Sequence, residues 1–278
     1  MDWCGLRLHL YMNPLQLSSG VSQLQISPLM THFDSGFWAH HFRRVFIREL
    51  RAFERAVVER VLPAFANLEF EAESIANDEF ERLGRMPGDD SIDMSDLAEE
   101  AQEEGLAHYA TLTGVRQAML NLFTAALFHM VEQQLLLFHR RQVLNPSEEY
   151  NSELFSWKVI HARFENGGVR LRDLNCWPAF HELEVVANTV KHGDGHSADE
   201  LRGLRPEVLV PVILRNEKGM MGRPTPYVRT PLTGESVHVT LPEFRRYADV
   251  AVSFWEEVAE ATLCQDSCRT AGVNRWCV

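Results

Sequence analysis

The chain has 278 residues, of which 45% are hydrophobic and 24% are charged, so it can form a hydrophobic core. Acidic residues outnumber basic ones 39 to 27, which gives a formal net charge of -12 at pH 7. This balance disfavours non-specific nucleic-acid binding, so an RNA ligand would have to meet a local basic patch. No stretch is apolar enough for a membrane helix, and the first residues do not resemble a signal peptide. We therefore expect a cytoplasmic protein with no membrane contact.

The five cysteines are odd in number and scattered along the chain. This pattern argues against a disulfide framework and favours reduced thiols. Cys264, Cys268 and Cys277 could hold a zinc ion, but no fourth ligand stands at zinc-finger spacing. We expect no cofactor.

Helical patterns fill most of the chain after an irregular N-terminal extension, residues 1–36. Apolar residues recur at spacings of three and four, which predicts a helical bundle over residues 37–205. The expected helices cover 37–62, 64–83, 95–143 with a break near Thr113 and Gly114, 149–165, 178–192 and 197–204. Pro63 is expected to interrupt the first of them, and Ser95 to cap the third.

A segment rich in Pro, Val and Thr, residues 206–240, predicts a small β or extended insert. The expected strands are Val208–Leu214, Tyr227–Thr230 and Ser236–Thr240. Thr240 and Glu243 then form a capping box, which predicts a last bundle helix over 241–263 and leaves a tail, 264–278. The fold class is therefore expected to be mainly α, a helical bundle with a small insert before the last helix.

The candidate site lies on the predicted helix 178–192, where Glu184, Asn188, Lys191 and His192 share one face. An imidazole can move protons near neutral pH, and a lysine can stabilise a negatively charged transition state. Asn188 could orient a phosphate, and Glu184 could orient His192 or pair with Lys191. A structural explanation competes with this one, because Lys and His suit the last turn of a helix that a glycine, Gly193, ends.

Two further residues support the candidate site. Glu132 lies in an apolar helical stretch, three residues after His129, and is either on the exposed stripe of that helix or a buried partner of Lys191 or His192. His196 follows the turn that contains Gly193 and Gly195. An alternative hypothesis is a metal-dependent enzyme whose ligands are His181, Glu184, His192 and His196.

The run Ala-Asn-Thr-Val-Lys-His-Gly, residues 187–193, together with the glutamate-bearing apolar helix and the bundle, is similar to the HEPN superfamily. That resemblance implies a compact helical bundle, usually a dimer, and in many members a metal-independent ribonuclease. The family motif is an Arg, a polar residue and then a His four to six residues after the Arg. Asn188 and His192 match the polar residue and the His, whereas Ala187 stands in place of the Arg.

The resemblance implies an RNA-cleaving effector of a bacterial toxin–antitoxin or phage-defence system, with an antitoxin or other partner protein and a homodimeric state. It implies that His192 acts on protons and that Asn188 and Lys191 contact the phosphate. Because Ala187 replaces the Arg, Lys191 would have to supply the charge. The alternative is a catalytically silent HEPN-like module that binds a partner protein or a nucleotide.

Overall fold

The computed structural model describes residues 34–86, 93–144, 148, 150–166, 169–215 and 231–270; the side chains of 166 and 265–270 lie outside this description. These residues form α-helices together with several 3-10 and π-helical turns, and no β-strand occurs among them. The α-helices are α1 (Ser35–His41), α2 (Ile47–Ala56), α3 (Leu68–Gly84), α4 (Met94–Phe138), α5 (Trp157–Asn166), α6 (Trp177–His192), α7 (His196–Leu204) and α8 (Leu241–Thr270). The mainly helical class is confirmed.

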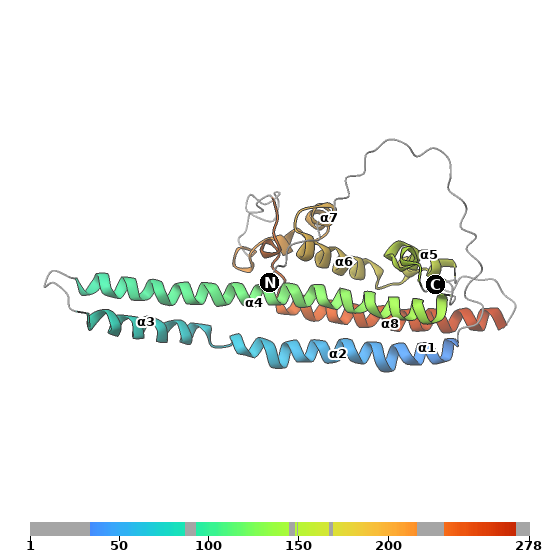
Figure 1. Ribbon diagram of the computed structural model, residues 1–278, viewed down its shortest axis with the longest axis horizontal. Coiled ribbons are helices and arrows are strands. Elements are labelled where there is room, and N and C mark those ends of the chain that lie inside the picture. Colours follow the sequence, from blue (N-terminus) through green and yellow to red (C-terminus); the bar gives the residue numbers. More distant parts are fainter. Residues whose placement is uncertain are drawn as a thin grey trace, which may run out of the picture.

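Two π-helical turns join the first helices into one rod, as the apolar spacing over 37–62 predicts. They are η1 (Phe42–Phe46) and η2 (Val57–Val61), and the 3-10 turn η3 (Leu62–Phe65), which contains Pro63, ends the rod. Figure 1 shows α3 continuing beyond this rod and α4 running back along both.

An aromatic cluster holds the rod against α4 and α8. The Phe42 and Phe46 rings lie 4.7 and 4.8 Å from the Trp255 ring, and the Trp38 ring lies 4.8 Å from Phe138. All five residues are buried, and burying an aromatic side chain stabilises a fold by about 2–3 kcal/mol. This cluster lies where the rod, α4 and α8 meet, and we call these packed helices, together with α5, α6 and α7, the body.

The helix α4 is unbroken over 45 residues, so the predicted break near Thr113 and Gly114 is wrong. Gly114 is exposed, and a Cβ there would meet no other atom, so an unbroken helix loses only about 1 kcal/mol relative to alanine. Figure 1 shows that α3 and the first half of α4 project beyond the other helices. We call this pair, residues 68–84 and 94–116, the arm.

On the opposite side of α4 and α8 from the rod lies α6, with α5 near one of its ends and α7 near the other (Figure 1). The η4 turn (His139–Val143) extends α4, and η5 (Ser152–Phe155) and η6 (Leu171–Asp173) flank α5. In the part of the chain that the structure describes, no helix is both long and apolar enough to cross a membrane.

The predicted strand Val208–Leu214 is wrong, because the 3-10 turns η7 (Pro206–Leu209) and η8 (Val212–Leu214) occupy it. Val237 is extended and residues 238–240 have no regular secondary structure, and one backbone hydrogen bond, from His238 N to Val208 O at 2.7 Å, does not make a ladder. The first residue of this predicted strand, Ser236, lies in the 3-10 turn η9 (Gly234–Ser236). Tyr227–Thr230 lies outside the described residues.

Several predicted boundaries shift. The N-cap of α4 is Asp93, whose carboxylate accepts from Ser95 N, rather than Ser95 itself. The capping box of α8 is confirmed, because Thr240 N donates to Glu243 at 2.7 Å and Glu243 N to Thr240 Oγ1 at 3.3 Å. The helix α8 runs past residue 263 into the predicted tail.

Cys264 is disulfide-bonded, so the expectation of a reduced thiol is wrong there.

Candidate functional site

The candidate residues lie on α6, whose inner face packs into the core. Its buried residues include Phe180, Leu183 and Val186, and Pro178 occupies the first turn, where a missing N–H costs nothing. The outer face carries a stripe at spacings of three and four: Trp177, His181, Glu184, Asn188, Lys191 and His192. The helix is therefore amphipathic, and its polar stripe contains all four predicted site residues.

The C-terminal end of α6 is fixed by a tight turn. Gly193 adopts φ 68°, and a Cβ at this position would lie 2.6 Å from Leu232 O. The amide of Asp194 donates to the same oxygen at 3.2 Å. Only glycine fits here, both because of its backbone conformation and because of the close approach.

Asn121, buried on α4, anchors the segment that holds this turn. Its amide donates to Gly234 O at 3.2 Å and to Val237 O at 2.6 Å, and its carbonyl oxygen accepts from Val239 N at 3.2 Å. A Cβ on Gly234 would lie 3.0 Å from Val190 O, so this segment presses against the last turn of α6. Asn121 of α4 thus fixes the segment around Gly234, and that segment supports the C-terminal end of α6.

Asn188, Lys191 and His192 lie together at this end. Lys191 and His192 are exposed and Asn188 is half-buried. Among the described residues, none of the three side chains makes a hydrogen bond or ion pair. These groups are therefore available to a ligand from solvent, and Lys191 and His192 also stand where basic residues favour the helix dipole.

Among the described residues, Glu184 pairs with His181 and not with Lys191 or His192. Nδ1 of His181 lies 3.1 Å from Glu184, and Nε2 lies 2.8 Å from Glu200 on α7. Burial alone lowers the pKa of His181, but the hydrogen bonds to Glu200 and Glu184 outweigh it and raise that pKa. His181 therefore contacts both carboxylates and joins α6 to α7.

Glu132 is also remote from the end of α6. It pairs with His129 at 3.0 Å. The two helices run antiparallel, because the Phe128 ring contacts Phe180 at 5.9 Å, whereas Asn121 lies beneath the other end of α6. Glu132 therefore lies toward the N-terminal end of α6 and is not the partner of Lys191 or His192.

His196 begins α7 and is exposed. No group of three or more His, Cys, Asp or Glu side chains that could hold a metal ion occurs within the described residues. His181, Glu184, His192 and His196 are thus not gathered as a ligand set, which removes the geometric basis of the metal-dependent alternative.

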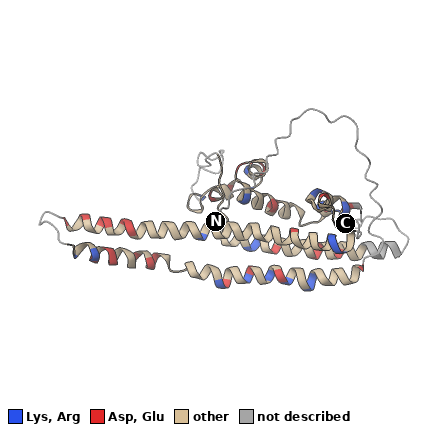
Figure 2. Ribbon diagram, viewed as in Figure 1, with Lys and Arg blue, Asp and Glu red and all other residues tan. Residues whose placement is uncertain are grey.

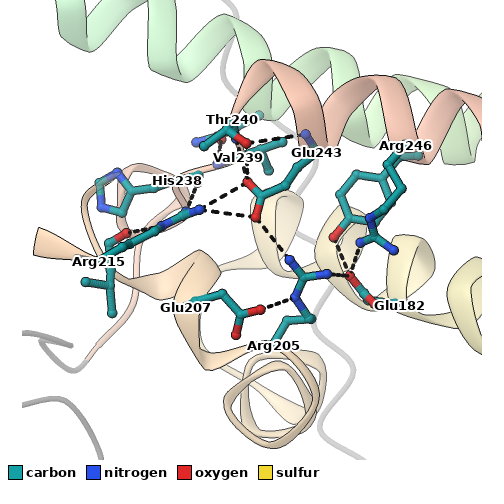
Figure 3. Close-up of polar contacts among 12 residues, drawn as sticks. Glu182, Arg205, Glu207, Arg215, His238, Val239, Thr240, Glu243 and Arg246 are labelled. Atoms are coloured by element: carbon teal, nitrogen blue, oxygen red, sulfur yellow. Dashed lines mark hydrogen bonds and ion pairs between the residues drawn. The ribbon is translucent and has the colours of Figure 1, made fainter. Parts of the chain in front are cut away.

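A second polar cluster lies on the inner side of α6 and stabilises the insert (Figure 3). Glu182 accepts from Arg205 at 2.9 Å, from Tyr247 Oη at 2.7 Å and from Arg246. Arg205 also donates to Glu243 at 3.1 Å. Although burial alone raises the pKa of Glu243, hydrogen bonds from Thr240 and the Arg215 guanidinium lower it. Because these carboxylates are paired with guanidinium groups of other elements, we interpret this cluster as structural.

A pocket that the sequence did not indicate lies between α5, η6 and α6. Its volume is about 780 Å³, within the range of small-molecule sites. Aromatic and basic side chains line much of it: Trp157, Lys158, His161, Arg172, Trp177 and His181. Trp157 and His161 are four residues apart, as are Trp177 and His181. This repeated spacing of a Trp and a His on two helices is the sequence pattern that could have indicated the pocket.

In comparisons with known proteins, no family model, no curated protein and no solved structure matches the chain. Its function must therefore be inferred from the residues of α6 and its neighbours.

Proposed function

We propose that the chain is a HEPN-like, metal-independent endoribonuclease that acts as the effector of a bacterial toxin–antitoxin or phage-defence system. The observation that supports this function best is the exposed end of α6, where Asn188, Lys191 and His192 share one edge and have no partners among the described residues. An amide, a cation and an imidazole at such an edge can reach a phosphate from solvent.

The proposed reaction is attack of a ribose 2′-hydroxyl on the adjacent phosphate. His192 takes the hydroxyl proton as general base or gives a proton to the leaving 5′-oxygen as general acid. Lys191 and Asn188 contact the phosphate oxygens and stabilise the charge that develops on them. The new bond closes a 2′,3′-cyclic phosphate, and the bond to the 5′-oxygen breaks to leave a 5′-hydroxyl end.

The position of the family's Arg offers nothing to the phosphate. Ala187 is only 4% exposed and belongs to the buried side of α6. Lys191 must therefore carry the positive charge, as a point charge rather than a bidentate fork. A homodimer that brings two α6 edges together would supply one imidazole as base and the other as acid.

An effector of this kind needs an antitoxin or other partner protein that restrains it, and its RNA substrate places it in the cytoplasm. We place the RNA on α6 because its exposed end carries Asn188, Lys191 and His192, and we exclude the arm because it is acidic. Figure 2 shows the acidic arm: residues 68–84 and 94–116 hold eleven acidic residues and two arginines.

A catalytically silent module that binds a nucleotide or a partner protein is the second candidate function. It is favoured by the missing Arg at Ala187 and by the aromatic pocket between α5 and α6. This candidate predicts binding of RNA or nucleotide without cleavage.

The test compares growth and total RNA integrity in bacteria that express the wild type or His192→Ala. We expect the wild type to arrest growth and fragment RNA, and the variant to be harmless, since a general acid or base contributes about 10²–10⁴-fold in rate. His40→Ala, which removes an exposed histidine from α1, is the matched control and should behave as the wild type. Intact RNA and normal growth with the wild type would refute the nuclease.

With purified protein, cleavage of an RNA oligonucleotide should continue in EDTA and yield 2′,3′-cyclic phosphate ends. Activity that EDTA abolishes would point to the metal-dependent alternative. Lys191→Ala should lose most of the activity, and a fully active Lys191→Ala would disprove the role of that side chain as the replacement for Arg.

A further inference from the structure

The pocket between α5 and α6 contains a row of aromatic rings. The His161 ring lies 4.6 Å from Trp157 and 5.2 Å from Trp177, and the Trp177 and His181 rings are stacked at 6.3 Å with 8° between their planes. Both tryptophans are only partly buried. Both tryptophans pack against the core and also line the pocket, so the part of each ring that faces the pocket is accessible to a planar ligand.

Two cationic side chains beside these aromatic rings have no ion-pair partner among the described residues. Lys158 and Arg172 line the pocket, are exposed, and form no ion pair with other described residues. By contrast, Arg170 is engaged with Asp173 at 3.3 Å. Positive charge is therefore available to a ligand that also carries an aromatic ring.

The pocket is not acidic, although it contains three carboxylates. Asp173 is bound by Arg170, which also lies 3.9 Å from Glu165, and Glu184 is bound by His181. His161 adds an unpaired group, because its Nε2 is buried without a hydrogen-bond partner among the described residues. Burial and the nearby Arg172 lower the pKa of His161 to about 4, so at neutral pH this nitrogen can accept or donate as a neutral imidazole.

We propose that this pocket is a subsite for single-stranded RNA, in which one base stacks on Trp157 and Trp177 and an adjacent phosphate binds Lys158 and Arg172. This inference rests on the proposed RNA substrate and adds where the strand is held. Stacking on aromatic side chains tolerates any base, and a basic groove follows the backbone. The site would therefore select a single strand rather than a particular sequence.

The position of the pocket on α6 connects it to the proposed cleavage edge. His181 and Glu184 line the pocket, and Asn188, Lys191 and His192 continue the same polar stripe toward the helix end. From His181 to His192 the helix rises by roughly 16 Å. A strand of about five stacked nucleotides spans that length, since each rises about 3.4 Å. One short strand can thus occupy both places.

The test measures binding of a fluorescein-labelled single-stranded oligoadenylate of about 12 nucleotides by fluorescence anisotropy. The full-length protein carries His192→Ala so that the probe stays intact. Trp177→Leu should weaken binding by roughly 10-fold or more, and Arg172→Glu should weaken it and reduce its dependence on salt. Two matched controls, Phe70→Leu and Arg44→Glu, change an exposed aromatic residue and an exposed arginine elsewhere and should leave binding unchanged.

Circular dichroism of each variant checks folding, and Lys158→Glu, a change on the surface, replaces any variant that does not fold. If Arg172→Glu and Lys158→Glu bind the RNA as tightly as the parent does, the subsite is wrong. Adenosine monophosphate in place of the RNA separates the two sources of a nucleotide: tighter pocket-dependent binding of the monophosphate than of RNA would also overturn the RNA subsite.

The two proposals can fail separately. Pocket-dependent RNA binding by a wild type that does not cleave would refute the nuclease and support the subsite. Cleavage that is unaffected by Trp177→Leu and Arg172→Glu would support the nuclease and refute the subsite.

Discussion

His139 should make the protein less stable in mild acid, and replacing it with phenylalanine should remove that weakness. The side chain follows α4 in η4, is fully buried, and has no hydrogen-bond partner for either ring nitrogen among the described residues. Its ring meets Phe155 edge-on at 6.3 Å. Burial, assisted by the nearby Arg163 charge, lowers the pKa of His139 from 6.5 to about 4. The folded protein therefore holds His139 neutral at pH values where the unfolded chain protonates it.

The change in unfolding free energy with pH follows from proton linkage. Between pH 6.5 and about 4 the unfolded state binds more protons at this residue, so stability is lost as the pH falls through that window. With these two pKa values, the loss attributable to His139 between about pH 7 and about pH 5 is roughly 2 kcal/mol. His139→Phe removes the titrating group, so the difference in unfolding free energy between the two pH values should shrink by about that amount.

Urea denaturation at both pH values, followed by tryptophan fluorescence, measures this difference. His40→Phe removes an exposed histidine and should leave the pH dependence unchanged. If His139→Phe and the wild type lose the same stability between the two pH values, His139 is not held neutral by burial and the reasoning is wrong.

Three further substitutions test the packing. Gly105→Val should loosen the arm by about 1–3 kcal/mol, because a Cβ there would lie 2.6 Å from Ala72 O; hydrogen exchange should quicken in α3 and not in α8. Gly193→Ala should lower the unfolding free energy by about 1–2 kcal/mol, because Gly193 has a φ of 68°. The control Gly203→Ala, which adds a Cβ in open space on α7, should not lower it. Equal melting temperatures for the two variants would refute the strain at Gly193. Glu182→Gln should cost about 2–3 kcal/mol, since it weakens charged hydrogen bonds with three donors, while Glu256→Gln breaks only an exposed pair with Arg43 and should cost under about 1 kcal/mol by urea denaturation.

Apolar spacing was enough to predict the helices, because each buries one face. The run from Phe37 to Leu62 was recognisable because its apolar residues recur every three or four positions, and Pro63 ends it as expected. Val208–Leu214 was mistaken for a strand, because a short apolar run can be buried equally well in irregular turns. Neither propensity nor period distinguishes these two cases without knowledge of the neighbouring helices.

The face of α6 was predictable, but the partners of its side chains were not. Spacing placed Glu184 and His192 on one stripe, yet Glu184 binds His181, only three residues away, because α7 brings Glu200 to the other side of that imidazole. Glu132 was assigned to the wrong end of α6, because sequence spacing carries no information on whether two packed helices run parallel or antiparallel. The pocket between α5 and α6 depends on the same long-range packing.

The length of α4 has a consequence for how the molecule unfolds. A single helix of 45 residues, about 68 Å long, belongs to the arm at one end and to the body at the other. Within the arm its buried residues are only Ala101 and Gly105, whereas from Leu120 onward it is buried repeatedly. Fraying that starts at Met94 therefore meets little resistance until it reaches Leu120, where the core begins. The helix is continuous in geometry but divided in stability, so the arm can open and close many times while the body, with α6 and its pocket, stays folded.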